Sequence, residues 1–277
     1  MKKLVIASLI MIVVGAVICG AVYAVKGPSI LDQQNLIENS YDVDDEFTDI
    51  TVDVTHNDVR LAAARDGVCR VECLDREGME HGVSVEDGTL VITSEEEEKT
   101  NFTFIGFTNR SPVVTIYLPE NEYGSLDINA TSGDIYLEDG IAFDSVDISV
   151  TTGDVSIVNL DMEGDITLDL VTGDAELSDV TCTNLIYNGT TGDIGLHNVI
   201  VAQQMKIDML TGDVLFDRSD AFEISVDVTT GDIEGVLLTA KSFDCSAVTG
   251  DISVPRDGNG GNCHIHVGTG DVFIQTA

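Results

Sequence analysis

Apolar and polar residues alternate with a period of two through most of the chain after residue 45. In the first part, the alternation runs through residues 50–63, 68–74, 82–94 and 113–119, in short stretches rich in Val, Ile and Thr. A period of two with many β-branched residues predicts short, half-buried β-strands. We therefore expect an N-terminal β region over residues 46–125.

From residue 126 to residue 277 the same alternation is interrupted by a Thr-Gly-Asp tripeptide, written once as Ser-Gly-Asp, that recurs every 19 or 20 residues. Apolar residues stand seven, five and three positions before most of its glycines, and two and four positions after them. A fixed period of this length indicates a repeat architecture, in which stacked coils bury a continuous core that one coil cannot bury alone. The recurring glycines are Gly133, Gly153, Gly173, Gly192, Gly212, Gly231, Gly250 and Gly270.

The sequence therefore predicts an all-β fold, a parallel β-solenoid with coils of about 20 residues. Each strand is expected to pair with the same strand of the next coil along the chain, about 4.8 Å away. Parallel crossovers are nearly always right-handed, so we expect a right-handed solenoid.

The tripeptide is expected to form the corner at which each coil reverses its direction. Glycine adopts positive φ without steric cost, and the neighbouring Thr and Asp oxygens accept hydrogen bonds from the turn's backbone. In the stretch 50–61, the residues His56-Asn57-Asp58 occupy the place of the tripeptide. Because Asn tolerates positive φ better than most residues, we expect a degenerate first coil there, continuous with the main solenoid.

The N-terminus differs from the rest of the chain. Residues 1–26 begin with two lysines close to the start, followed by 22 residues without a charge, which as a helix would span roughly 33 Å. We expect one transmembrane anchor over 1–26 with its N-terminus in the cytoplasm, an acidic tether over 27–45, and an extracytoplasmic C-terminal domain at the cell membrane. A cleaved signal peptide is the alternative, because Val22-Tyr23-Ala24 resembles a cleavage site.

The charge balance restricts the class of partner. The chain has 49 acidic residues against 13 Lys and Arg, a formal net charge of −36. Such a surface repels phosphate backbones, which excludes nucleic acid as a partner. The expected partners are the membrane, through the N-terminal helix, and an envelope protein or surface glycan that the sequence does not identify.

The six cysteines of an exported chain raise the question of disulfides. Cys69 and Cys73 share a strand face but lie about 13 Å apart, too far to form a bond with each other. Cys19 falls in the expected anchor. The remaining three are expected to be buried free thiols that pack as small apolar side chains; these are Cys182, Cys245 and Cys263.

Candidate metal ligands are few. His264 and His266 share one outward strand face, without an evident third ligand, and the alternative is that both simply face solvent. The corner aspartates should form a column in which either backbone N–H groups or bridging calcium ions offset the repulsion between carboxylates. We expect no cofactor, with calcium as the alternative; the candidate ligands in this column are Asp193, Asp213, Asp232 and Asp251.

No nucleophile-elbow or phosphate-binding motif occurs in the chain. The irregular segment 101–112 carries Phe102, Phe104 and Phe107, and is expected either to contact a partner or to pack over the end of the solenoid.

The combination of "FTDITVDVTHNDVRL" (47–61), "GTLVITS" (88–94), "VTIYLP" (114–119) and the serial "TSGDI", "TTGDV" and "TTGDI" corners resembles a known family. It is similar to the bacterial "putative adhesin" domains of unknown function, exported β-solenoids that include LiaG-like envelope proteins. The resemblance covers about residues 45–277. It implies a membrane-anchored envelope protein and supplies no catalytic residues.

Three functions agree with these observations. The first is a non-enzymatic, membrane-anchored surface module for adhesion, envelope sensing or protein contact. The second is a carbohydrate-active solenoid, whose mark would be a concave surface with clustered aromatic residues and three or more carboxylates. The third is a cation-binding scaffold.

Overall fold

The computed structural model describes residues 36–76, 79–96, 112–138, 141–256 and 258–277. This part of the chain is entirely β, as the alternation predicts, and contains no helix that is apolar and long enough to span a bilayer. The expected anchor, residues 1–26, and the aromatic segment from 101 to 111 lie outside the described residues. The strands are β1 (Leu36–Asp42), β2 (Asp49–Val54), β3 (Asp58–Ala63), β4 (Arg70–Arg76), β5 (Met79–Glu86), β6 (Thr89–Glu96), β7 (Val113–Leu118), β8 (Tyr123–Ser132), β9 (Ile135–Leu137), β10 (Phe143–Thr152), β11 (Val155–Asp161), β12 (Asp165–Thr172), β13 (Ala175–Thr191), β14 (Ile194–Thr211), β15 (Val214–Thr230), β16 (Ile233–Leu237), β17 (Ser242–Thr249), β18 (Ile252–Ser253), β19 (Asn262–Thr269) and β20 (Val272–Thr276).

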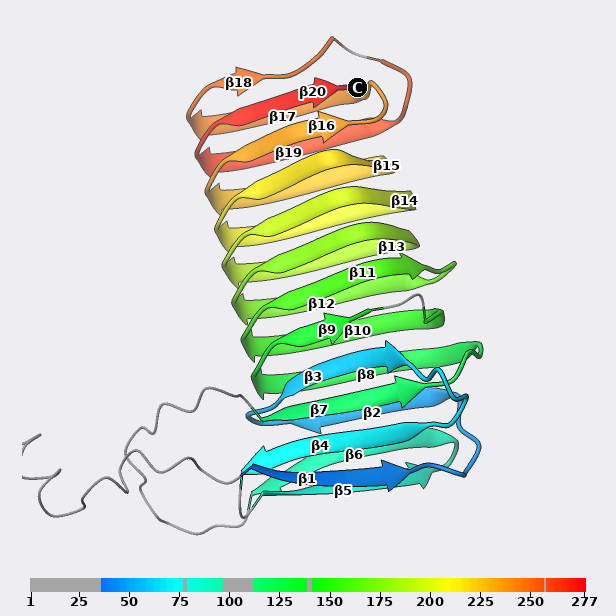
Figure 1. The fold of residues 1–277 in the computed structure, drawn as a ribbon. Helices are drawn as coiled ribbons and strands as arrows, with labels where there is room; N and C mark the ends of the chain where they lie inside the picture. Colours follow the sequence, from blue (N-terminus) through cyan, green and yellow to red (C-terminus); the bar gives the residue numbers. More distant parts are fainter. Residues whose placement is uncertain (1–35, 77–78, 97–111, 139–140, 257) are drawn as a thin grey trace, which may run out of the picture.

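The strands stack into an elongated solenoid with two faces (Figure 1). We call the strands that lead into a corner glycine the entry face and those that follow it the exit face. Within the repeats, neighbours on each face are parallel and in register, so that Ile148 lies beside Leu168 and Leu168 beside Tyr187. The entry face has the spatial order β5, β6, β2, β8, β10, β12, β13, β14, β15, β19, β17. The exit face has the order β1, β4, β7, β3, β9, β11, β13, β14, β15, β16, β20, β18.

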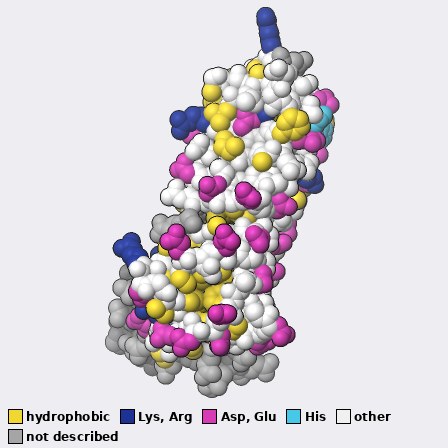
Figure 2. Space-filling view, turned by 90° about the vertical axis from the view of Figure 1, so that its right-hand side faces the viewer, with side chains coloured by type: hydrophobic (Ala, Val, Ile, Leu, Met, Phe, Trp, Pro, Cys, Tyr) yellow, Lys and Arg dark blue, Asp and Glu magenta, His cyan; other side chains and the backbone are white. Residues whose placement is uncertain are grey.

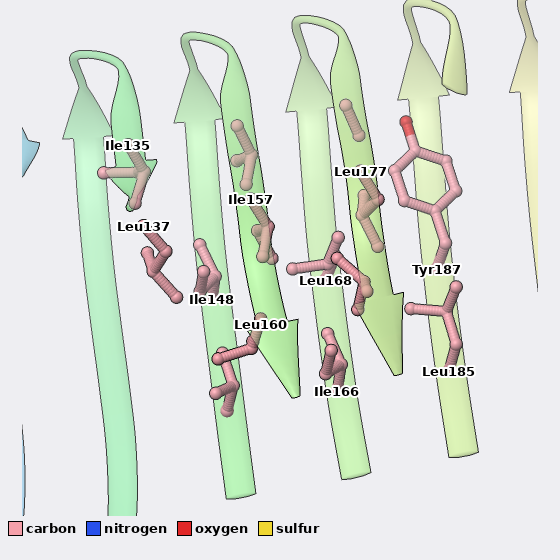
Figure 3. Packing of buried hydrophobic residues seen from close by; sticks show 14 of the residues in the cluster. Ile135, Leu137, Ile148, Ile157, Leu160, Ile166, Leu168, Leu177, Leu185 and Tyr187 are labelled. Carbon is pink, nitrogen blue, oxygen red and sulfur yellow. The ribbon is translucent and has the colours of Figure 1, made fainter. Parts of the chain in front are cut away.

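The core lies between the two faces and consists of columns of equivalent residues from successive coils. Ile148, Ile157, Leu168 and Leu177 are fully buried and point into this space (Figure 3). The coil around Tyr187 departs from the pattern, because the ring takes more room than the aliphatic side chains on either side. Gly189 supplies that room, since a Cβ at this position would lie 2.7 Å from the Tyr187 ring.

The corner glycines are required for two separate reasons. Their φ angles lie between +135° and +149°, a region that residues with a side chain rarely adopt. In addition, a Cβ on any of them would lie 1.8–2.1 Å from the carbonyl oxygen of the equivalent residue in a neighbouring coil. For Gly192 that oxygen belongs to Gly173. The coils therefore pack directly backbone to backbone at the corner.

The aspartate that follows each corner glycine links its coil to the next. Its backbone N–H donates to the Oδ1 of the equivalent aspartate in the neighbouring coil, at N···O distances of 2.7–3.0 Å, so that Asp193 donates to Asp174 and accepts from Asp213. These bonds form one ladder from Asp58 to Asp251. They place a partial positive charge against every carboxylate of the column except the last, which opposes the repulsion between neighbouring carboxylates.

In four consecutive coils the second corner is formed by a residue with a side chain at positive φ. Asn159, Asp179, Asn198 and Arg218 each stand six residues after a corner glycine and have φ between 53° and 56°. Asn and Asp reach this conformation at lower cost than other residues with a side chain. The pairing skips these corner residues and shifts register at or just after them, yet β13, β14 and β15 each continue as one strand from the exit face of one coil onto the entry face of the next.

The order of the coils in space differs from the expected order at both ends. β19 and β20 insert between the Gly231 coil and the β17–β18 coil, so Gly231 N–H donates to Thr269 O and Gly270 N–H donates to Thr249 O. At the other end, β2–β3 lies between β6–β7 and β8–β9. The expectation of strictly sequential stacking was wrong, because coils of equal length and equal register can pair in either order.

Two expectations about the N-terminal region also need correction. Residues 36–42, within the expected tether, form β1 and pair with β4. Asn57 does occupy the register of a corner glycine, since Asp134 N–H donates to Asp58 Oδ1. However, Asn57 is absent from the positive-φ residues of the described chain. Its side chain is instead buried and donates to Asp75.

The first prediction concerns the corner. We expect Gly192→Ala to lower the free energy of unfolding by about 3 kcal/mol or more, because it adds both backbone strain and a collision with Gly173 O. Gly67→Ala is the control: Gly67 has a φ of +73°, but no atom lies within 4 Å of the place that a Cβ would take, so strain alone should cost about 1 kcal/mol. Chemical denaturation measures both changes; equal losses would show that the collision between coils does not matter.

The second prediction concerns calcium. Because a backbone donor already binds one oxygen of nearly every corner aspartate, we expect the calcium-depleted chain to keep its β-structure by circular dichroism. Calcium chloride should raise the Tm no more than sodium chloride at equal ionic strength. Stoichiometric, tight calcium binding in a calorimetric titration would contradict this expectation.

Candidate functional site

The sequence-derived candidate ligands do not converge on a common point. No three of His264, His266 and the corner aspartates bring ligand atoms together in the part of the chain that the structure describes. His264 Nδ1 lies 3.5 Å from Asp244 Oδ2, and His266 Nδ1 lies 2.9 Å from Ser246 Oγ. Each histidine thus contacts the residue beside it on β17, and the corner aspartates Asp193, Asp213, Asp232 and Asp251 form the ladder described above.

A shallow groove of about 460 Å³ follows the outer side of the entry face, across six coils close to the glycine corners. Its carboxylates are Asp53, Asp169 and Asp208. Asn188 Nδ2 donates to Asp169 Oδ1 at 2.6 Å, so polar side chains of neighbouring coils in this groove bind one another. On the neighbouring outward row, burial and then the charges of Asp127 and Asp169 raise the pKa of Asp147.

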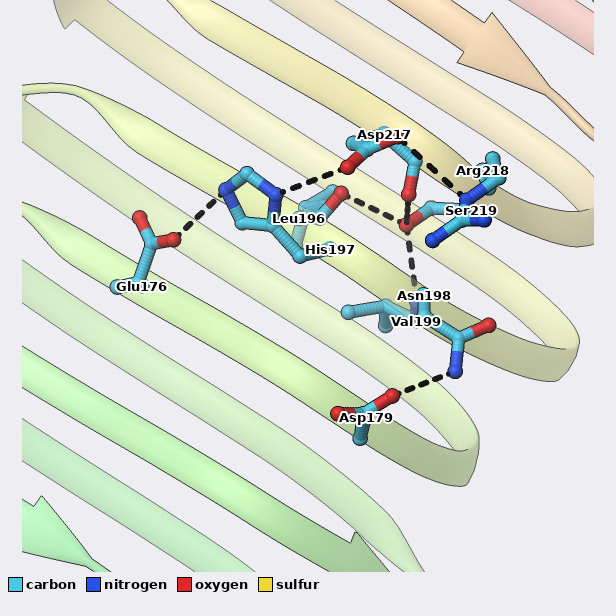
Figure 4. Close-up of polar contacts among 9 residues, drawn as sticks. All are labelled: Glu176, Asp179, Leu196, His197, Asn198, Val199, Asp217, Arg218 and Ser219. Atoms are coloured by element: carbon cyan, nitrogen blue, oxygen red, sulfur yellow. Dashed lines mark hydrogen bonds and ion pairs between the residues drawn. The ribbon is translucent and has the colours of Figure 1, made fainter.

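His197, which belongs to none of the sites expected from the sequence, lies between two carboxylates on the exit face (Figure 4). Its Nε2 is 2.7 Å from Glu176 Oε1, and its Nδ1 is 3.4 Å from Asp217 Oδ2. The nearby Ser219 Oγ donates to Leu196 O at 2.8 Å and accepts from Val199 N–H at 2.9 Å. Because that hydroxyl is buried and bound to the backbone, the cluster lacks an available nucleophile and links three coils instead.

A larger hollow, of about 700 Å³, opens at the loops that join the N-terminal strands. Figure 2 faces this side and shows exposed hydrophobic side chains between acidic ones in the lower part of the molecule. Tyr123 and Phe47 line the hollow with ring centroids 5.9 Å apart, beside the consecutive acids Asp44, Asp45 and Glu46. Because Tyr123 is buried, the hollow presents three acidic residues and one accessible aromatic ring, which is fewer than the cluster of aromatic residues expected of a carbohydrate-active surface.

The cysteines of the described chain are all free thiols. Burial raises the pKa of Cys73, Cys182 and Cys263 to about 12, and the pKa of Cys69 and Cys245 to about 11. Burial therefore keeps these thiols from acting as free nucleophiles at neutral pH. Cys245 is only half-buried, contrary to expectation, because β17 pairs with β19 alone among the described strands.

A second missed cluster lies in the layer formed by β4 and β5. Cys73 and Asp75 are inward residues of β4. His81 is an inward residue of β5, followed on the same side of the strand by Val83 and Val85. The sequence signal that could have revealed this cluster is a carboxylate and an imidazole at inward strand positions that are otherwise apolar. They do not match any metal-binding motif by their spacing, so the pattern alone did not reveal them.

Comparisons with known proteins agree with this architecture. No curated protein matches the chain. Solved structures with the same fold include two putative adhesins. The first, from Bacteroides fragilis NCTC 9343, has a TM-score of 0.60 and 18% identity, and the match covers 88% of this chain and 98% of that one. The second, from Parabacteroides distasonis ATCC 8503, has a TM-score of 0.50 and 15% identity, and the match covers 87% of this chain and 98% of that one.

The family model described as Toastrack DUF4097 matches residues 47–164 and again residues 161–277. The two matches together cover nearly all of the stacked coils, including the degenerate β2–β3 coil. The chain therefore belongs to the Toastrack DUF4097 family, a bacterial domain family of unknown function whose structural neighbours are described as putative adhesins.

Proposed function

We propose that this chain is a non-enzymatic surface module, anchored in the cell membrane by residues 1–26, that holds a rigid β-solenoid outside the cytoplasm for protein contact, adhesion or envelope sensing. The observation that carries the proposal is the difference between the two ends of the rod. The N-terminal segment joins the chain at β1, at one end, whereas β17 and β18 form the opposite end (Figure 1).

The dimensions suit a spacer that presents its far end. Eleven strands of the entry face at about 4.8 Å spacing give a rod of about 50 Å. Continuous backbone ladders on both faces, together with the aspartate ladder at the corners, make the rod stiff along its length. An anchor at the β1 end would hold the β17 end away from the membrane.

The far end offers a sheet edge. β17 pairs only with β19, and β18 only with β20, among the described strands. Val248 is 78% exposed and Ile252 is 42% exposed, and the inward residues Cys245 and Ala247 are only half-buried. An exposed edge beside apolar side chains accepts an added strand from a partner, whose backbone supplies the affinity and whose side chains supply the specificity.

The outer faces support a role in contact more than one in catalysis. The polar rows on these faces bind largely to one another, as Asn188 does to Asp169 and His197 does to Glu176. The histidine between carboxylates has no available hydroxyl nucleophile beside it. With a formal net charge of −36, the chain favours a neutral or basic partner over an anionic one.

A second candidate function rests on the hollow at the N-terminal loops. The half-buried ring of Phe47, which stacks on the buried Tyr123, lies beside the carboxylates of Asp44, Asp45 and Glu46. A sugar ring packs on aromatic faces and donates hydroxyl hydrogen bonds to carboxylates, so it suits this surface. This candidate is a glycan-binding surface near the anchored end.

The third prediction tests location and contact together. In intact cells that produce the full chain, a membrane-impermeant maleimide with a photoreactive group should label Val248→Cys, and light should then couple that site to a partner. Val171→Cys is the matched control, because Val171 and Val248 both stand two residues before a corner glycine and both are exposed, but Val171 lies in the middle of the stack. It should be labelled without capturing the partner.

Absence of labelling at both positions would contradict the extracytoplasmic location. Equal capture from both positions would contradict the far end as the contact surface. Capture of a glycan from Glu46→Cys, with none from Val248→Cys, would favour the second candidate function.

A further inference from the structure

The layer next to the β6–β7 coil is closed by antiparallel strands in place of a regular coil. There β4 belongs to the exit face and β5 to the entry face, and β4 ends and β5 begins on the side of the glycine corners (Figure 1). Inside this layer, polar side chains replace the apolar columns: Cys73 and Asp75 come from β4, and His81 comes from β5. Asn57, in the corner register of the β2–β3 coil, packs against them.

These groups lie close together and are shielded from solvent. One ligand atom from each of Cys73, Asp75 and His81 lies within 4.8 Å of the others. The exposed fractions of the three residues are 0%, 1% and 7%. His81 Nδ1 is 2.9 Å from Asp75 Oδ2, and Asn57 Nδ2 is 3.2 Å from Asp75 Oδ1.

Two buried polar atoms in this cluster have no hydrogen-bond partner within the described part of the chain, namely His81 Nε2 and Asn57 Oδ1. Buried polar atoms without partners are rare, because each loses its hydration without compensation. A buried carboxylate, imidazole and thiol in one place are likewise costly unless something binds them. The cluster therefore has room for a further group that the described residues do not provide.

We propose that Cys73, Asp75 and His81 bind one Zn²⁺ ion that joins the two faces of the solenoid at its N-terminal end. Zinc takes sulfur, nitrogen and carboxylate oxygen ligands in the same site, whereas calcium and magnesium prefer oxygen alone. Three protein ligands leave the fourth position of a tetrahedral site to water, and Asn57 Oδ1 is an acceptor for it.

The site lies where the regular glycine corners of the stack end. Elsewhere in the repeats a glycine corner joins an entry strand to an exit strand that are both parallel to their neighbours. In this layer β4, which ends at Arg76, and β5, which begins at Met79, run antiparallel to their neighbours β7 and β6. A metal bound by β4 and β5 would hold the two faces together where the stack ends. Zinc binding would therefore add to the stability of the fold, as it does in other structural zinc sites.

The fourth prediction is measured by elemental analysis of the full chain, purified in detergent without chelator from cells supplied with zinc. We expect about one zinc ion per chain in the wild type and in Cys69→Ser, and a loss of that zinc in Cys73→Ser. Cys69 is the matched control because it is a buried cysteine beside the same strand, on the same inward side. Cobalt in place of zinc should give thiolate-to-cobalt absorption in the wild type and in Cys69→Ser, but not in Cys73→Ser.

If Cys73→Ser fails to fold, the conservative variants Asp75→Asn and His81→Gln test the zinc site in its place. Each should retain β-structure by circular dichroism and bind zinc at least about 10-fold more weakly than the wild type. A wild-type chain that takes up no zinc and shows no cobalt–thiolate absorption would overturn the proposal. Folded Asp75→Asn and His81→Gln chains that bind zinc as tightly as the wild type would overturn it equally.

Discussion

The close approach of backbone to backbone at the glycine corners is the constraint on which the rest of the structure depends. The carbonyl oxygen of one corner glycine occupies the space that a Cβ of the next would need, as Gly173 O does beside Gly192. This approach keeps successive coils in one register, so that buried residues such as Ile148 and Leu168 form columns. It also brings each corner aspartate to the backbone N–H of its neighbour, which turns a row of like charges into a ladder of hydrogen bonds.

Much of this architecture could be predicted from the sequence, because strands and corners depend on local chemistry. A period of two marks the inward residues, and a glycine every 19 or 20 residues marks the coils. The order of the coils could not be predicted, since the Gly250 and Gly270 coils are equal in length and register and either could follow Gly231. The site formed by Cys73, Asp75 and His81 was missed because its members match no spacing motif and meet only when β4 and β5 close the layer.

The same constraint determines where function can reside. Along the middle of the rod, every coil repeats its neighbour, and polar side chains such as Asn188 and Asp169 bind one another. The repeat ends at two places, the edge strand β17 and the antiparallel layer of β4 and β5. Our two proposals, a contact surface at the far end and a zinc ion at the anchored end, both concern these places, because there the regular stack leaves backbone or side-chain groups without partners among the described residues.

The most direct test of the backbone contact between coils is residue-resolved amide hydrogen exchange on the native chain. The amides of Asp154, Asp174, Asp193 and Asp213 belong to exposed corner residues yet donate to a carboxylate of the adjacent coil. If the corners hold the coils together, these amides should exchange as slowly as those of buried strand residues such as Ile157 and Leu168, in one cooperative unit. Rapid exchange at the corners beside slow exchange in the strands would contradict the account.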